Sequence, residues 1–308
     1  CGKIAGRYES REIGSLAYGH AAAYQNNGNF ELKGCVDVSK DRAAWFGEKY
    51  LIPHSGTDLS SVVDLVKPDV VSVTTPDDTH FQIVEELLEN PNIKPSLIFL
   101  EKPALSTKVE LETLIRLTEL KNVPIVVNHT RRFHPLYRAI KKKYGSGGFG
   151  RLVRVDSTYY GGWRHSAIHL VDIVQYLFSR NIFNPRIIEK ISTELDNDST
   201  FTVRAILGSE EIPVWFHGWD DIHYQLFDLE FRFSKGRLRI TNFEQEVVWE
   251  ESYKNSMGER VLRPKNMDCL FVTESAMTNA VAVISDYLDS KDISLLKGVL
   301  LSDIVSTM

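Results

Sequence analysis

The chain has few cysteines, and their spacing suits neither a metal site nor a disulfide framework. Only three occur among 308 residues, Cys1, Cys35 and Cys269, an odd and widely scattered set. Zinc sites and redox motifs use closely spaced cysteine pairs, which this chain does not contain. A disulfide-stabilised secreted scaffold is therefore excluded, and we expect reduced thiols.

The chain also lacks long apolar runs and an excess of positive charge. No run approaches the roughly 20 apolar residues that a membrane-spanning helix needs, and the first residues do not have the pattern of a signal peptide. The formal net charge is -5 and the pI is about 6.0, whereas a protein that neutralises phosphates along a nucleic acid needs a basic face. We therefore expect a cytoplasmic protein that acts on a small molecule, with neither nucleic acid nor membrane as its partner.

What the sequence does contain is enough apolar material for two domains. Hydrophobic residues make up 43% of the chain and charged residues 25%, which is ordinary for globular proteins. Over residues 30–129, short apolar runs alternate with helix-length amphipathic segments, the mark of βαβ units. After about residue 130, alternating strands predominate. We predict a Rossmann-type doubly wound parallel sheet over residues 1–129, followed by an α+β domain with a mainly antiparallel, open sheet over residues 130–308.

The expected elements follow from hydrophobic periodicity and from capping signals. In the first domain we expect strands at 31–36, 69–74, 97–100 and 123–127, and helices at 58–66, at 80–88 and behind a Thr107–Glu110 capping box. In the second we expect strands at 152–159, 201–207, 212–216, 226–233 and 237–240, and helices at 166–178 and 273–288.

The start of the chain resembles part of a dinucleotide-binding fingerprint. Residues 1–6 read Cys-Gly-Lys-Ile-Ala-Gly and fit G-x-G-x-x-A if one glycine precedes them. In such a loop the backbone approaches a pyrophosphate, and the next helix N-terminus supplies donors, so Gly2, Lys3 and Ile4 are candidate cofactor contacts. The alternative is an ordinary glycine turn. Because a doubly wound sheet has its first strand at the centre, we expect the natural protein to continue upstream with about five or six apolar residues and a glycine.

Asp37 closes the strand that follows the fingerprint. An acid at this place accepts hydrogen bonds from the ribose hydroxyls and favours NAD over NADP, because a 2′-phosphate would meet its charge. Lys40 and Arg42 nearby weaken that repulsion. The alternative is a solvated turn aspartate.

Two further motifs follow the carboxyl ends of predicted parallel strands, where open α/β sheets bind ligands. Thr75-Pro76 precedes a helix that begins near His80, and Glu101-Lys102-Pro103 follows a fully apolar strand. The alternative for the first motif is a strand that ends at a proline and is followed by a helix cap. The alternative for the second is a pair of charged residues on the surface.

In this order, the motifs resemble the GFO/IDH/MocA oxidoreductase family. The residues that carry the resemblance are Gly2 to Ala5, Asp37, Thr75-Pro76 with His80, Glu101-Lys102-Pro103, Asn128 with Arg132-Phe133, and His169 with Asp172. The resemblance implies that Thr75 and Pro76 line the cofactor, that Glu101 lies near the nicotinamide ribose, and that Lys102 contacts the substrate hydroxyl.

The activity that the resemblance implies is NAD-dependent hydride transfer at a secondary alcohol of a sugar, cyclic polyol or nucleotide sugar. His169 would take the proton as a general base, while the Lys102 ammonium stabilises alkoxide charge. Family members pair through the C-terminal sheet, so a homodimer or homotetramer is expected.

The chain departs from the family pattern in two places. Four residues before His169 the family often has an aspartate, but here His165 stands there, so the proton-transfer role is shared or altered. Residues 7–19 form an apparent insertion between the fingerprint and His20.

Other residues near these positions are candidates for substrate binding. Aromatic faces and a guanidinium suit a sugar ring with an anionic group, and the candidates are Tyr160, Trp163, Arg164, Asp172 and Arg132. Alternatively, the aromatic residues cap the core and the charged residues are a solvated face.

Three alternatives remain open from the sequence. His165, His169 and Asp172 have the i, i+4, i+7 spacing of a helical metal site, although we predict none. The second alternative is a non-catalytic NAD-binding sensor or regulatory protein on the same fold. An assembly protein that uses its open sheet is the third, and it leaves Asp37 and Lys102 unexplained.

Overall fold

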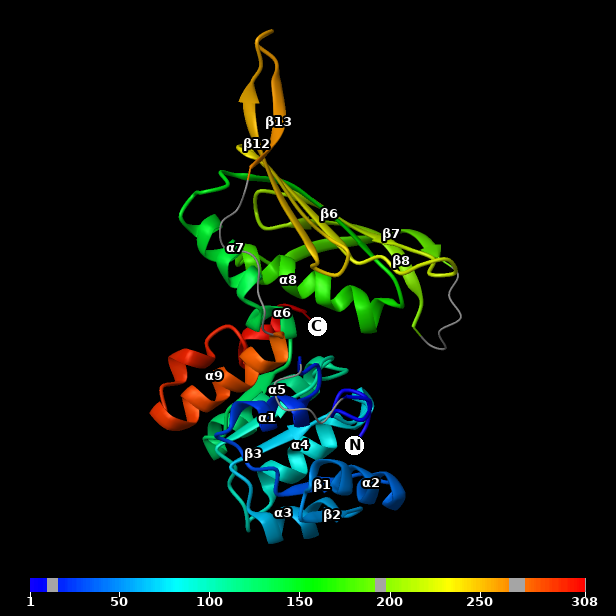
Figure 1. Cartoon of the computed structure of the whole chain (residues 1–308), viewed down its shortest axis with the longest axis vertical. Helices are drawn as coiled ribbons and strands as arrows, with labels where there is room; N and C mark the ends of the chain where they lie inside the picture. The colour runs from blue at the N-terminus through cyan, green and yellow to red at the C-terminus, as the bar shows by residue number, and fades with distance from the viewer. Residues whose placement is uncertain (10–15, 192–197, 266–274, 308) are drawn as a thin grey trace. The chain divides into compact units, whose positions relative to one another are not determined.

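The computed structural model describes residues 1–9, 16–191, 198–265 and 275–307, and it divides into two compact units (Figure 1). Residues 1–134 with 273–306 form what we call the N-terminal unit, and residues 135–272 form the sheet unit. Cys269 and residues 10–15 of the expected insertion lie outside the described residues. Within the described ranges, no helix is both long and apolar enough to cross a bilayer.

The N-terminal unit contains parallel strands in two separate sheets. One has the order β1-β2 and the other the order β3-β4-β5, and each pairing is parallel. The strands are β1 (Gly34–Val36), β2 (His54–Gly56), β3 (Val70–Val73), β4 (Leu97–Leu100) and β5 (Ile125–Val127). The prediction of an α/β fold with parallel strands is confirmed.

Helices alternate with these strands along the chain. They are α1 (His20–Asn27), α2 (Lys40–Tyr50), α3 (Leu59–Val66), α4 (His80–Glu89), α5 (Lys108–Lys121), the short α6 (Thr130–Phe133) and α9 (Ala276–Ser290), with 3-10 turns at Asp77–Thr79, Ile293–Leu296 and Leu301–Thr307.

Local sequence signals account for several of these boundaries. Asp58 caps α3 by accepting from the backbone N–H of Ser61 at 2.7 Å. Thr107 and Glu110 form the expected capping box at the start of α5, with both reciprocal hydrogen bonds present. All four residues of β4 are fully buried, which explains why its sequence shows no polar alternation.

Helix α9 belongs to the N-terminal unit although it comes last in the chain. Its apolar face, including Val281 and Ile284, packs with Ala23 and Tyr24 of α1 in one buried cluster. The sequence predicts that residues 130–308 form the second domain, whereas the structure assigns α9 to the N-terminal unit. Hydrophobic periodicity cannot show that the chain returns to the N-terminal unit at α9, because the apolar face of a helix does not specify which sheet or helix covers it.

The sheet unit is built on one eight-stranded sheet with the order β13-β12-β11-β10-β6-β9-β8-β7. Every pairing is antiparallel except that of β6 with β9, as the prediction of a mainly antiparallel sheet requires. The strands are β6 (Leu152–Tyr159), β7 (Ile182–Ile191), β8 (Thr200–Leu207), β9 (Ile212–Gly218), β10 (Asp228–Phe233), β11 (Gly236–Thr241), β12 (Glu246–Lys254) and β13 (Arg260–Lys265).

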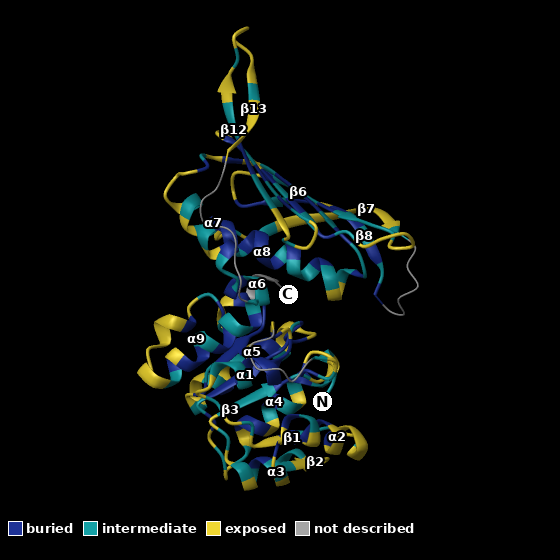
Figure 2. Cartoon of the chain, viewed as in Figure 1, coloured by how far each residue is buried: buried dark blue, intermediate teal, exposed yellow. Residues whose placement is uncertain are grey.

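The sequence patterns did not reveal β7, β12 and β13. Strands β7 and β13 form the two edges of the sheet and are mostly exposed (Figure 2). Both contain a proline, Pro185 and Pro264, which is tolerated at edges but weakens a strand signal. Strand β12 pairs with β13, and its residues do not alternate regularly between buried and exposed as those of a half-buried strand do.

One face of this sheet is covered by α7 (Pro135–Gly145) and α8 (Ile168–Phe178). The helices and the inward-facing strand residues form one large apolar core, with Tyr137, Ile173 and Phe231 fully buried. We expected the helix to begin at residue 166. Instead a π-helical turn, Trp163–Ala167, precedes α8.

Candidate active site

Glu101 lies at the carboxyl end of β4, where it is buried and fixed by two neighbours. Its Oε1 lies 2.8 Å from Nε2 of His20 in α1 and accepts from Nδ2 of Asn128 at 2.6 Å. Asn128 follows β5, the neighbouring strand. Helix α1, strand β4 and the segment after β5 therefore meet at this carboxylate. Side chains that follow neighbouring parallel strands are expected to meet in this way, because the carboxyl ends of the strands lie at the same edge of the sheet.

The electrostatic balance at Glu101 keeps the carboxylate ionised. Burial alone raises the pKa of Glu101, but hydrogen bonds and charge interaction with His20, the Asn128 hydrogen bond and the charge of Lys102 together lower it below its ordinary value of 4.5. The edge of the sheet therefore carries a fixed negative charge directly beside Lys102.

Lys102 is partly exposed and follows Glu101 in the loop after β4. Thr75 and Pro76 follow β3, the strand paired with β4, and both are exposed. The structure thus brings two of the predicted cofactor contacts and the predicted catalytic lysine to the same edge of one sheet.

His80 joins these two loops. Its ring lies 3.0 Å from the carbonyl oxygen of Thr75 through Nε2, and 2.9 Å from that of Pro103 through Nδ1. The side chain is only 1% exposed. We predicted His80 as a cofactor contact, but a ring enclosed between two backbone carbonyls acts by holding the Thr75 and Lys102 loops in place.

The loop at the start of the chain packs against the N-terminus of α1. The first amides of the helix, those of His20 and Ala21, donate to the carbonyl oxygens of Ile4 and Ala5 at 3.1 and 3.0 Å. These two amides are therefore used within the chain, in contrast to the expectation that the helix start supplies pyrophosphate donors. Beside Gly2 there is open space, since a Cβ added there would have no atom within 4 Å. A contact between Gly2 and a cofactor phosphate stays a prediction.

Asp37 lies just past β1, as predicted, and is largely enclosed. Arg42 donates to its Oδ1 from Nε at 2.9 Å, and the amide of Ser39 donates to the same oxygen. Burial raises the pKa of Asp37, yet the hydrogen bonds from Arg42 and Ser39 lower it below its ordinary value of 3.8. The carboxylate fits a hydroxyl donor, while Arg42 beside it is the group that would meet a 2′-phosphate.

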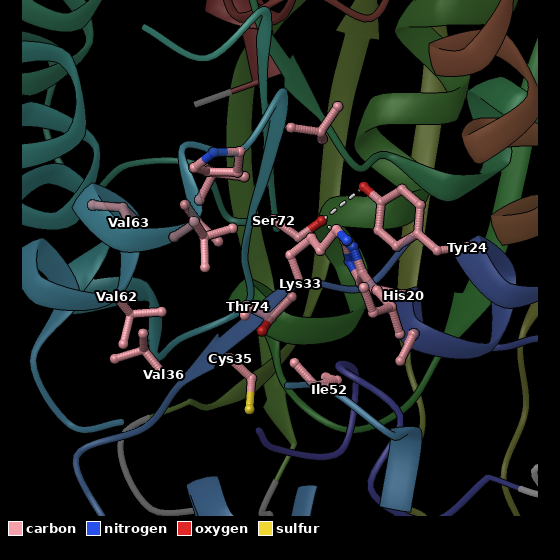
Figure 3. A pocket seen from close by; sticks show the side chains of 18 of the residues that line it. His20, Tyr24, Lys33, Cys35, Val36, Ile52, Val62, Val63, Ser72 and Thr74 are labelled. Carbon is pink, nitrogen blue, oxygen red and sulfur yellow. Dashed lines mark hydrogen bonds between the residues drawn. The ribbon is translucent and has the colours of Figure 1, made fainter. Parts of the chain in front are cut away.

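The N-terminal unit contains a cavity of about 950 Å³ that lies between β1 and β3 (Figure 3). Cys35 and Val36 of β1 line it together with Ser72 and Thr74 of β3, and the hydroxyl of Tyr24 is hydrogen-bonded to Ser72 at 2.8 Å. Each of these strands pairs on one side only, so β1 and β3 are edge strands of their sheets.

This cavity, which we call the strand slot, has a mixed lining. Apolar side chains such as Val63 and Val73 line it together with polar and charged ones, among them Asp37 and Thr75. The backbone edges of β1 and β3 also line it, and an extended polypeptide would pair with both edges and join the two sheets. We place the candidate active site at the neighbouring strand ends that carry Glu101 and Lys102.

In the sheet unit, His165 lies in the π-helical turn and its side chain is 61% exposed. Its Nδ1 is 2.7 Å from Oδ2 of Asp198, a carboxylate that is only 6% exposed. Nothing in the sequence pattern indicated Asp198, because it precedes β8 in a polar run without a recognisable motif.

The other predicted residues of the sheet unit differ in accessibility. Tyr160 and Trp163 are partly buried and pack edge-on against Phe243 and Phe216, which supports the core-capping alternative. Arg164 is exposed, His169 is partly buried in α8, and Asp172 is 1% exposed.

Arg132 lies in α6 of the N-terminal unit and is buried, donating to the carbonyl oxygen of Gly298. It connects α6 to the segment after α9. A direct substrate contact by Arg132 stays a prediction.

Among the described residues, no group of three His, Cys, Asp or Glu side chains is placed to hold a metal ion. The π-helical turn also interrupts the regular spacing between His165 and α8. The alternative of a helical metal site therefore loses its geometric basis.

His20 contacts Glu101 directly but is not among the site residues that the sequence predicts. The available signal is its position, since His20 begins the first helix after the apparent insertion. What could not be read from the sequence is that α1 carries this ring to the end of β4.

Comparison with known proteins supports the α/β assignment. The family model described as "Oxidoreductase family, NAD-binding Rossmann fold" (GFO_IDH_MocA) matches residues 13–129. The putative oxidoreductase YceM of Salmonella typhimurium is 28% identical over 159 residues, 49% of this chain and 49% of that protein. The chain spans about half the length of the curated relatives it matches.

Solved structures resemble nearly the whole chain. UDP-N-acetylglucosamine 3-dehydrogenase GnnA from Acidithiobacillus ferrooxidans has a TM-score of 0.75 at 14% identity, covering 94% of this chain and 89% of that one. A super-repressor mutant of Gal80p from Saccharomyces cerevisiae has a TM-score of 0.70 at 15% identity, covering 89% and 82%. At such identities the likeness shows the fold alone.

Proposed function

We propose that this chain is an NAD-dependent dehydrogenase, because its residues 13–129 match the GFO/IDH/MocA oxidoreductase family model and about half of the chain resembles a putative oxidoreductase. The substrate class we propose is a secondary alcohol or ketone of a sugar, cyclic polyol or nucleotide sugar. A nucleotide-sugar dehydrogenase among the structural relatives is consistent with that class.

The observation that carries this proposal is the placement of Lys102. Its backbone N–H donates to Oε2 of Glu101 at 3.3 Å, and Glu101 is itself held by His20 and Asn128. An ammonium group beside a fixed, buried carboxylate at the carboxyl edge of parallel strands is suited to orient a hydroxyl group.

The residues of the chain would divide the reaction as follows. Lys102 orients the substrate oxygen and stabilises the negative charge that develops on it when its proton leaves. A histidine of the sheet unit, His165 or His169, holds that proton. The nicotinamide, when bound, supplies the hydride acceptor or donor.

Gly2 and Asp37 are the residues that we propose to hold the cofactor. The open space beside Gly2 accommodates the pyrophosphate, and the ionised Asp37 accepts from ribose hydroxyls. We propose NAD in preference to NADP because the Asp37 carboxylate opposes a 2′-phosphate. The Arg42 contact reduces this preference.

The test combines binding and turnover. Titration with NAD and NADP gives the two dissociation constants, and absorbance of reduced nicotinamide is followed with sugars, cyclic polyols and nucleotide sugars. We expect tighter binding of NAD, and turnover that Lys102→Ala lowers by about 100-fold or more while NAD affinity changes little, since the lysine acts on the substrate oxygen.

The matched control is Lys108→Ala, because Lys108 is an exposed lysine at the start of α5. It should leave both turnover and NAD affinity unchanged. Equal turnover in Lys102→Ala and the wild-type protein would overturn the role of the lysine.

A non-catalytic NAD-binding regulator is the second candidate. The observation that favours it is the likeness in fold to a super-repressor form of Gal80p, together with His165 at the position where the family often has an aspartate. Tight NAD binding without turnover of any compound in the panel would favour the regulator.

A further inference from the structure

The π-helical turn before α8 is organised around one buried carboxylate. Asp198 accepts from the backbone N–H of Arg164 at 2.9 Å and from that of His165 at 3.0 Å, while the imidazole Nδ1 of His165 lies 2.7 Å away. Asp198 is 6% exposed, and the ring that it contacts is 61% exposed.

The surrounding chain is shaped to admit this carboxylate. Gly162 has a φ of 91°, and a Cβ there would lie 2.1 Å from Oδ2 of Asp198, so only glycine fits. The amide of Gly162 donates to Oγ1 of Thr200, and that of Trp163 to the carbonyl oxygen of Ser199. The turn and the segment from Asp198 to Thr200 therefore hold each other on both sides of the carboxylate.

A carboxylate at Nδ1 determines what the other ring nitrogen can do. Nδ1 must carry a proton to donate to Asp198, so in the neutral ring Nε2 is the basic nitrogen. The carboxylate also stabilises the imidazolium that forms when Nε2 takes a proton. A buried acid that orients an accessible histidine is the arrangement that general-base catalysis requires.

We propose that His165 is the proton acceptor of this enzyme and that Asp198 is its positioning residue. This inference rests on the proposed dehydrogenase function. The only role that the turn itself requires of Asp198 is to cap two backbone amides. The contact to an exposed ring goes beyond that structural requirement.

In the direction of alcohol oxidation, the hydroxyl proton passes to Nε2 of His165. The carbon-bound hydrogen leaves with its electron pair as a hydride to oxidised nicotinamide, and the O–H electron pair becomes the second bond of the carbonyl group. The imidazolium then releases its proton to water. In the reverse direction, His165 donates the proton.

The first test reads the ring directly and needs no substrate. Nitrogen-15 NMR of the full chain, with His165→Gln used to assign the signal, should show that in the neutral ring Nδ1 carries the proton and Nε2 does not. Asp198→Asn should shift the tautomer balance toward protonated Nε2. A wild-type ring without tautomer preference, or one unaffected by Asp198→Asn, overturns the proposal.

The second test measures turnover across pH. His165→Gln should lower kcat by about 100-fold or more and remove the acidic limb of the kcat profile, with NAD affinity retained. Asp198→Asn should lower kcat more than it changes KM. His223→Gln is the matched control, because His223 is an exposed histidine of the same unit.

Each outcome separates this inference from the function on which it rests. Loss of turnover in His169→Gln but not in His165→Gln overturns it and returns the proton to His169. If Asp198→Asn does not fold, the tautomer of His165 in the wild-type protein and the pH dependence of kcat in His165→Gln still test the proposal. Wild-type NAD binding without turnover of any substrate in the panel contradicts the proposed function, and with it the catalytic role of His165, whatever the tautomer.

Discussion

At the scale of single residues, the candidate site depends on buried polar groups that hydrogen-bond to Glu101. Glu101 is buried, yet His20 and Asn128 both reach it, and the pKa of Glu101 is lowered as a result. Removing one partner from such a network leaves the other buried groups without a hydrogen bond, and this lowers the stability of the folded protein. The same carboxylate therefore contributes to stability and to the site.

Glu101→Gln tests that dual role through the pH dependence of unfolding. A carboxylate whose folded pKa lies below its unfolded value of about 4.5 stabilises the protein above that pH, and this stabilisation is lost as the pH falls through the folded pKa. The variant should therefore lose about 2 kcal/mol of unfolding free energy at neutral pH and much less in acid. Urea denaturation at several pH values measures it.

The control for this prediction is Glu112→Gln, since Glu112 is an exposed glutamate of α5. It should behave like the wild-type protein at every pH. A stability loss in Glu101→Gln that is the same at neutral and acidic pH would show that packing, and not ionisation, is responsible.

At the scale of elements, the N-terminal unit has two sheets where a doubly wound fold has one. The strand slot separates β1 from β3, and each of these strands is the edge strand of a parallel sheet. The backbone nitrogen of Cys1 lies 3.2 Å from Oδ2 of Asp37, at the carboxyl end of β1. An extended segment attached to that nitrogen and lying in the slot would therefore run parallel to both strands.

We predict that an apolar segment of about six residues and a glycine, fused ahead of Cys1, will stabilise the unit. Such a strand would pair with β1 and β3 and bury apolar surface in the slot. The melting temperature should rise by several degrees, and NAD should bind more tightly because the Gly2 loop becomes anchored.

A serine-rich segment of equal length is the matched control, because it has little apolar surface to bury in the slot. It should leave the melting temperature unchanged. An apolar fusion that melts at the same temperature as this control would contradict the role of the slot as a strand acceptor.

At the scale of the whole molecule, the sheet unit presents one face that α7 and α8 do not cover. Trp215 lies on that face, stacked on His217 and near the guanidinium groups of Arg154 and Arg204. Paired charges such as Arg154 with Asp156 surround it. A two-fold dimer interface brings the same face of two chains together, so that face must be complementary to itself. An aromatic residue surrounded by both positive and negative side chains meets this requirement.

We predict that the chain forms a homodimer or homotetramer through this face and that Trp215→Glu dissociates it. The new carboxylate would be buried in the interface without a partner. Light scattering should give a multiple of 35.1 kDa for the wild-type protein and for the control Trp45→Glu on α2, but the single-chain mass for Trp215→Glu. A monomeric wild-type protein would contradict the proposal.

The sequence by itself determined the class of each unit, because burial leaves a direct trace in hydrophobic pattern. The apolar run 97–100 predicted a strand buried on both faces, and the Thr107–Glu110 pair predicted where α5 begins; both are confirmed. The motif order also predicted which residues follow the strand ends. These are local properties, and each depends on residues close together in the chain.

Only the tertiary structure decided which distant groups meet. His20 reaches Glu101, Asp198 reaches His165, and α9 packs on α1, although long stretches of chain separate the members of each pair. Hydrophobic periodicity shows that a side chain is buried, but not what it is buried against. Contacts between polar groups depend on how whole elements pack, so the positioning partners of the candidate catalytic residues became visible only in the folded chain.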